Sequence, residues 1–68
     1  MTYEHAILDV VRYTARGSQF EYTAIIEVAD DHGEDPHTVI RDVKALREAS
    51  PLISLQGLRA EQKLARTK

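Results

Sequence analysis

The four residues Gly33-Glu34-Asp35-Pro36 constrain the fold most, because they separate two amphipathic segments by a very short link. Asp35 suits an N-cap, since its carboxylate can accept hydrogen bonds from the unpaired N–H groups of a first helical turn. Pro36 suits the first helical position because it has no N–H to leave unpaired. Gly33 follows the preceding apolar pattern, as glycine does at many helix ends. The sequence therefore predicts two helices joined by three residues, which is a helix-turn-helix.

Apolar residues recur at helical spacing in three segments, at residues 2–16, 23–32 and 36–49. Each segment has an apolar face and a polar face, which is typical of helices that pack on a shared core. Gly17 is the predicted stop of the first helix. The predicted core consists of Ile7, Leu8, Val11, Thr14, Ala15, Phe20, Ile25, Ile26, Val28, Ala29, Val39, Ile40, Val43 and Leu46.

The start of the second helix has two interpretations. Ser18 and Glu21 have the spacing of a capping box, in which the serine caps the helix and the glutamate supports the cap. In the other interpretation Thr23 is the cap, and residues 18–22 form an extended link that buries Phe20. The apolar spacing after Thr23 favours the second interpretation.

Beyond the third helix the pattern changes. Ser50-Pro51 ends the helix, because the residue before a proline disfavours helical geometry. The apolar stretch Leu52-Ile53-Ser54-Leu55, followed by Gln56-Gly57, predicts a strand and a turn. Residues 58–68 fit a second strand, a short helix or a flexible tail. The predicted fold is α+β, mainly α: a single winged helix-turn-helix domain over residues 1–68, with three helices followed by a short β-hairpin or strand and tail.

Composition narrows the class of protein. The chain has 68 residues, of which 43% are hydrophobic and 29% charged, as is typical of soluble globular proteins. It has no cysteine, so neither a disulfide nor a thiolate metal site supports the core. No apolar run approaches the roughly 20 residues of a membrane helix. The N-terminal residues lack the basic flank and apolar core of a signal peptide. We expect a cytoplasmic protein without membrane contact.

Motifs for catalysis and for metal binding are missing from the sequence. It contains no glycine-rich phosphate loop, no cysteine nucleophile and no serine in a nucleophile elbow, so we expect neither enzyme activity nor a cofactor. The acidic residues 27–35 lie near His32 and His37 but lack the spacing of an EF-hand. The two histidines are also not four apart on one helix. We therefore expect a solvated helix end and no metal site.

The charges are divided unequally between the two halves of the chain. Residues 1–35 carry eight acids and two bases, a net charge of −6, and residues 36–68 carry three acids and seven bases, a net charge of +4. Such asymmetry indicates an anionic partner for the basic half. Attraction between the two halves within one fold explains it equally well.

The stretch ADDHGEDPHTVIRDVKAL, residues 29–46, resembles the helix-turn-helix of DeoR-type bacterial regulators. It departs from that family at Glu34, where the family has an apolar turn residue, and at Ile40, where it has the first of two arginines. The resemblance covers about 25 residues, and a comparable one exists to the winged-helix domains that end archaeal replicative helicases. It implies a winged helix that binds DNA. The matching positions are Ala29, Gly33, Asp35, Thr38, Val39, Arg41, Asp42, Val43 and Leu46.

The third helix is the predicted DNA reader. If its apolar face packs inward, the residues near its N-terminus reach base edges in the major groove. These residues are His37, Thr38, Arg41 and Asp42. Arg41 suits guanine O6 and N7, and Asp42 suits the amino group of cytosine.

Other basic residues are predicted to contact phosphates. Such contacts fix the register of the protein on the duplex without reading its sequence. They are Lys44 and Arg47 on the third helix, and Arg59, Lys63, Arg66 and Lys68 in the hairpin or tail. The alternative is a solvated polar face on which Lys44 pairs with Glu48, four residues later.

The predicted function is binding of double-stranded DNA, as a transcriptional regulator or as an accessory factor of DNA replication or maintenance. Because the isoelectric point is near 5.8, affinity would depend on a concentrated basic patch and on dimerisation. The adjacent Val10 and Val11 suit a homodimer formed through the first helix. The alternative function is a protein–protein interaction module without DNA contact, in which the acidic side of the second helix meets a basic partner.

Overall fold

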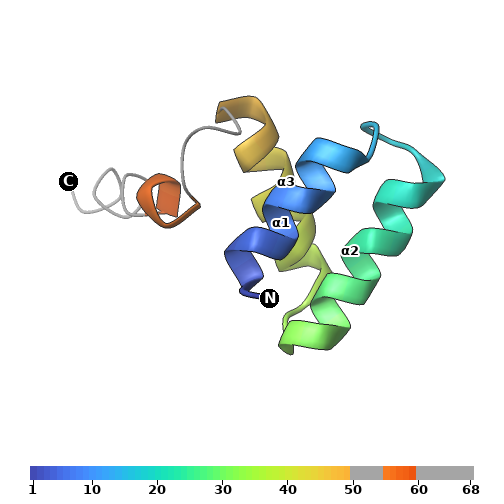
Figure 1. The fold of residues 1–68 in the computed structure, drawn as a ribbon, viewed down its shortest axis with the longest axis horizontal. Helices are drawn as coiled ribbons and strands as arrows, with labels where there is room; N and C mark the ends of the chain where they lie inside the picture. Colours follow the sequence, from blue (N-terminus) through green and yellow to red (C-terminus); the bar gives the residue numbers. More distant parts are fainter. Residues whose placement is uncertain (50–54, 60–68) are drawn as a thin grey trace.

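Three helices form the body of the protein in a computed structural model, which describes residues 1–49 and 55–59. They are α1 (Tyr3–Tyr13), α2 (Gln19–His32) and α3 (Pro36–Ala49). Each helix packs against both of the others. Figure 1 shows α1 crossing in front of α3, with α2 on one side and the helical residues 55–59 on the other.

The predicted winged fold is wrong, because the described residues form helices joined by short links and contain no strand. Leu55, Gln56 and Gly57, which were predicted to end a strand and form a turn, are all in helical conformation. Residues 52–54 and 60–68, which complete the predicted strand and tail, lie outside the described residues. A short apolar stretch does not distinguish a strand from a buried helix. Here Leu55 is buried in the helical core, with 3% of its surface exposed.

Helix α1 begins where Thr2 caps it. The Thr2 hydroxyl oxygen accepts a hydrogen bond from the His5 N–H at 3.2 Å. The helix ends at Tyr13, three residues earlier than predicted, because Thr14 adopts extended backbone angles (φ −124°, ψ 142°). Gly17, the predicted helix stop, instead lies in the link to α2 with φ +77°, a left-handed conformation that glycine adopts readily.

Helix α2 begins with the capping box, and the prediction that Thr23 caps it is wrong. The Ser18 hydroxyl oxygen accepts from the Glu21 N–H at 3.1 Å, and the Glu21 carboxylate accepts from the Gly17 N–H at 3.1 Å. The cap adds a turn of helix before Thr23. Phe20 therefore lies in that first turn with 78% of its surface exposed, and its prediction as a core residue is also wrong.

The turn between α2 and α3 is the one predicted. Gly33 has left-handed backbone angles (φ +64°), and the Glu34 N–H donates to the Ala29 carbonyl at 2.9 Å, which closes the end of α2. The Asp35 carboxylate accepts from the His37 N–H at 2.8 Å, and Pro36 is the first residue of α3. Local capping chemistry thus places α3 three residues after α2.

The core lies between the three helices. Its largest fully buried side chains are Ile7, Val39, Val43 and Leu46. On α1, Val10 is buried and Val11 partly buried against the core, so both contribute to packing within one chain. The predicted inward positions Ile26 and Ile40 are 41% and 38% exposed, because neighbouring positions on their helices face the core instead. None of the helices formed by the described residues has the length and apolar character needed to span a membrane.

Candidate functional site

Asp42 on α3 is buried, with 3% of its surface exposed. The Tyr3 hydroxyl donates to Asp42 Oδ2 at 2.6 Å, and the Arg59 guanidinium donates to the same oxygen. Arg41 Nη2 lies 3.6 Å from the other carboxylate oxygen. Asp42 therefore accepts hydrogen bonds within the protein and does not present its carboxylate to a base edge.

Tyr3 and Arg59 hold the region around Asp42 together. The Arg59 guanidinium carbon lies 5.3 Å from the Tyr3 ring centroid, a cation–π distance, and the His32 ring meets Tyr3 edge-on at 5.7 Å. Burial raises the pKa of Tyr3 well above its ordinary value, and the hydrogen bond to Asp42 raises it further. Partial burial alone would lower the pKa of Arg59, but the hydrogen bond to Asp42 helps to raise it overall. The cluster joins both termini of the described chain to α3.

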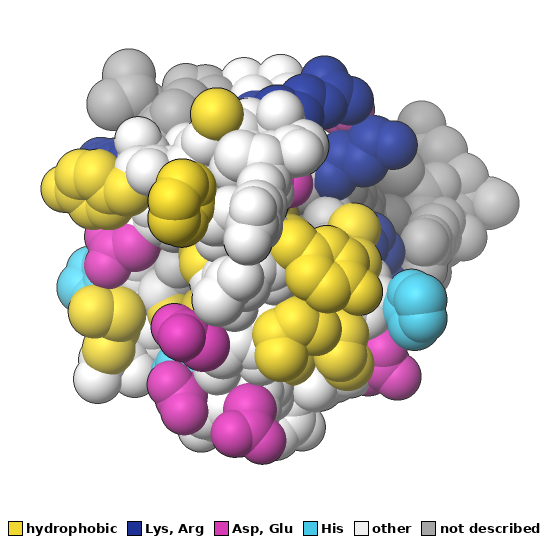
Figure 2. All heavy atoms as spheres, turned by 90° about the vertical axis from the view of Figure 1, so that its right-hand side faces the viewer, with side chains coloured by type: hydrophobic (Ala, Val, Ile, Leu, Met, Phe, Trp, Pro, Cys, Tyr) yellow, Lys and Arg dark blue, Asp and Glu magenta, His cyan; other side chains and the backbone are white. Residues whose placement is uncertain are grey.

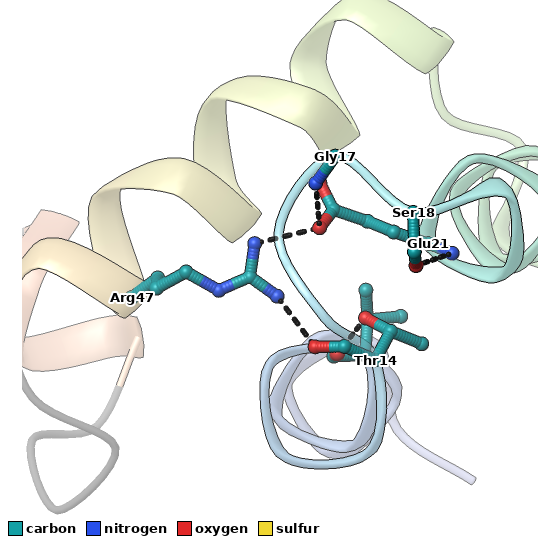
Figure 3. A network of polar contacts seen from close by, with 6 residues as sticks. Thr14, Gly17, Ser18, Glu21 and Arg47 are labelled. Carbon is teal, nitrogen blue, oxygen red and sulfur yellow. Dashed lines mark hydrogen bonds and ion pairs between the residues drawn. The ribbon is translucent and has the colours of Figure 1, made fainter.

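Arg47 makes a second internal contact set, shown in Figure 3. Its Nη1 donates to Glu21 Oε2 at 2.8 Å, and its Nη2 donates to the Thr14 carbonyl at 3.2 Å. The same Glu21 oxygen accepts from the Gly17 N–H. One arginine of α3 thus fastens the end of α1 and the start of α2. Only 20% of the Arg47 side chain is exposed, so it is committed to the fold.

The remaining predicted DNA-binding residues of α3 face outward. Arg41 has 63% of its side chain exposed, and its one ion pair with a described residue is the 3.6 Å contact to Asp42. Lys44 is exposed and forms no ion pair with residues 1–49 or 55–59, so the Lys44–Glu48 pair of the alternative interpretation is not formed. His37 is exposed and Thr38 half-buried. Lys63, Arg66 and Lys68 lie outside the described residues. We call His37, Thr38, Ile40, Arg41 and Lys44 the outer α3 surface.

A hollow of about 260 Å³ lies beside the outer α3 surface, and its lining includes Arg16, which is not among the predicted DNA-binding residues. Its lining includes Lys44 and Ile40 of α3 together with Arg16 from the link between α1 and α2. Arg16 is exposed and, like Lys44, forms no ion pair within the described part of the chain. No local pattern places Arg16 beside Lys44, because only the packing of α3 against the link brings them together.

A second hollow, which we call the α1/α2 groove, has a volume of about 410 Å³. Its apolar residues are Met1, Ala6, Val10, Tyr13, Ala24 and Val28, and its acidic residues are Asp9, Glu27 and Asp31, with Thr14 and His32 completing the lining. Figure 2 shows the face that carries α2, where acidic side chains gather toward the lower part and basic ones along the upper edge. No three His, Asp or Glu residues of the described chain are grouped closely enough to hold a metal ion.

No protein-family model, curated protein or solved structure gives a significant match to this chain.

Proposed function

We propose that this chain binds duplex DNA through the outer α3 surface. The observation that carries the proposal is the exposure of Arg41 and Lys44 on one helix. Lys44 forms no ion pair with a described residue, and Arg41 forms only the 3.6 Å pair with Asp42 among the described residues. Asp42, Arg47 and Arg59 have no part in the interface, because their charged groups bind within the protein.

The geometry of α3 suits the major groove, which is wide enough to admit one α-helix. The helix has 14 residues and follows α2 after a three-residue turn, with α1 and α2 packed behind it. His37, Thr38 and Arg41 belong to its N-terminal half, from which side chains reach base edges in helix-turn-helix proteins. Arg41 is the residue assigned to guanine, since its guanidinium can donate two hydrogen bonds to O6 and N7.

Lys44 and Arg16 are assigned to phosphates flanking the groove. Both line the hollow beside the outer α3 surface. The acidic residues Glu21 and Glu48 also line this hollow. Arg47 already neutralises Glu21 there. Because the whole chain carries a net charge of −2, we expect low affinity and a strong dependence on these few cations. Two phosphate contacts predict that log K falls with log salt at a slope of roughly −2, at about −0.9 per contact.

The test is fluorescence anisotropy of a labelled duplex, titrated with the full chain at several salt concentrations. The Arg41→Ala/Lys44→Ala double variant should lose most of the affinity, and the loss of the Lys44 phosphate contact should reduce the salt slope by about 1 unit. Arg12→Ala is the matched control, because Arg12 is exposed on α1 and does not line the hollow beside the outer α3 surface. Equal losses from the control and the double variant would show non-specific attraction only. Binding that survives the double variant would refute the proposal.

The biological role follows from this activity. A domain of this kind acts as a transcriptional regulator or as an accessory factor of DNA replication or maintenance, in the cytoplasmic compartment that holds the DNA. Contacts from one short helix give modest specificity, so a partner or a second copy of the chain would extend the interface.

A further inference from the structure

The floor of the α1/α2 groove is apolar, and two of its residues are small. Ala6 of α1 and Ala24 of α2 leave space that larger side chains would fill, while Val10 and Val28 supply buried apolar surface beneath it. Tyr13, 79% exposed, also lines the groove. An exposed tyrosine beside an apolar hollow is a common anchor in protein interfaces.

The walls of the groove carry negative charge on both sides. Asp9 stands on α1, and Glu27 and Asp31 stand one helical turn apart on α2, about 6 Å along the helix axis. None of the three forms an ion pair with another described residue. They also do not converge as a metal site. The groove thus presents separate carboxylates along an apolar floor, an arrangement that matches a row of cations better than a single ion.

We infer that the α1/α2 groove binds an amphipathic helix of a partner protein, with apolar residues on the inward face and Lys or Arg on both flanks. Apolar side chains one turn apart would enter the floor, which is the usual mode of helix-in-groove recognition. Long basic side chains can cover apolar surface with their stems while their charged ends reach the carboxylates. The charge pattern selects a basic helix over an acidic one, because like charges across an interface are costly.

This site is independent of the proposed DNA interface. No residue of α3 lines the α1/α2 groove, and no residue of the outer α3 surface belongs to it. A partner helix in the groove therefore leaves Arg41 and Lys44 accessible. Failure of one proposal does not imply failure of the other.

The test uses two synthetic helical peptides added to the isotope-labelled full chain, with backbone amide shifts followed by NMR. Both peptides carry leucine at the inward positions, and one has lysine and the other glutamate on its flanks. The lysine peptide should shift the amides of Ala6, Val10, Ala24 and Val28, and the glutamate peptide should not. Added salt should weaken binding of the lysine peptide, because it screens the attraction between the lysines and the carboxylates of the groove.

Two variants separate charge from shape. Glu27→Gln/Asp31→Asn keeps the side-chain size and should weaken lysine-peptide binding by about three- to tenfold, the size expected for two exposed ion pairs. Asp30→Asn is the matched control, since Asp30 is exposed on α2 but does not line the groove, and it should bind as the original chain does. Ala24→Leu fills the floor and should abolish binding while leaving DNA affinity unchanged.

Three outcomes would overturn the inference. The first is equal binding of the two peptides, and the second is amide shifts confined to α3. The third is a shift of the groove amides with protein concentration alone, which would make a second copy of this chain the occupant. If the variants unfold, their amide spectra will show it, and the peptide comparison on the original chain still decides the result.

Discussion

Replacing Asp42 with alanine should cost this protein a large part of its stability. The substitution removes the acceptor of the Tyr3 hydrogen bond, 2.6 Å long, and of the Arg59 hydrogen bond. A hydrogen bond to a charged group contributes about 1.5–3 kcal/mol. The Arg59 side chain is 42% exposed, so its share is reduced by solvent. We expect Asp42→Ala to lower the free energy of unfolding by about 2–4 kcal/mol, against a total of roughly 3–10 kcal/mol for a chain of this length.

The hydrogen bond between Tyr3 and Asp42 makes the two substitutions non-additive. Tyr3→Phe alone should cost about 1–2 kcal/mol, because Asp42 keeps Arg59 as a partner. In the double variant the cost should be close to that of Asp42→Ala, since the shared contact is counted once. Urea unfolding followed by circular dichroism gives all four free energies.

Asp30→Ala serves as the control, since Asp30 is an exposed carboxylate without an ion pair among the described residues. It should change stability by less than about 0.5 kcal/mol. The reasoning fails if Asp42→Ala is as mild as this control, or if the costs of Tyr3→Phe and Asp42→Ala simply add.

Three further outcomes are expected. The raised pKa of Tyr3 means that, as pH rises, the Tyr3 hydroxyl loses its proton at a lower pH in the unfolded chain than in the folded one. The stabilisation that Tyr3 contributes is therefore complete below pH about 10 and declines above it. Urea unfolding should show a weaker decline of stability with pH for Tyr3→Phe than for the original chain. Arg47→Ala should lower the free energy of unfolding by about 1–3 kcal/mol in the same assay, because it leaves the largely buried Glu21 carboxylate without its cation. A loss below about 0.5 kcal/mol would contradict the Arg47–Glu21 contact drawn in Figure 3. Phe20→Ala should leave the melting temperature nearly unchanged, and a large fall would show that the ring is buried.

Features that depend on neighbouring residues were predictable from the sequence. The turn at Gly33, the Asp35 cap and the start of α3 at Pro36 follow from interactions that span only a few residues. The buried positions Val39, Val43 and Leu46 follow from helical periodicity in the same way. The Ser18–Glu21 spacing of the capping box is equally local, but the apolar pattern after Thr23 favours a later start, so the start of α2 is ambiguous in the sequence.

Helical periodicity indicates that Asp42 is buried. Asp42 lies three residues after Val39 and four before Leu46, so it belongs to the inward face of α3. Its partners gave no such signal, because Tyr3 and Arg59 are distant in sequence and meet it only in the folded chain. Leu55 was ambiguous for a related reason, since its helical conformation accompanies burial against the other helices.

The sequence alone predicted the turn from α2 into α3 and the inward positions of α3, because caps and periodicity act within one or two turns of the chain. Only the tertiary structure decided which charges remain accessible, because an ion pair depends on segments that are brought together by packing. Folding commits Asp42, Arg47 and Arg59 to internal contacts and leaves Arg41 and Lys44 exposed on α3.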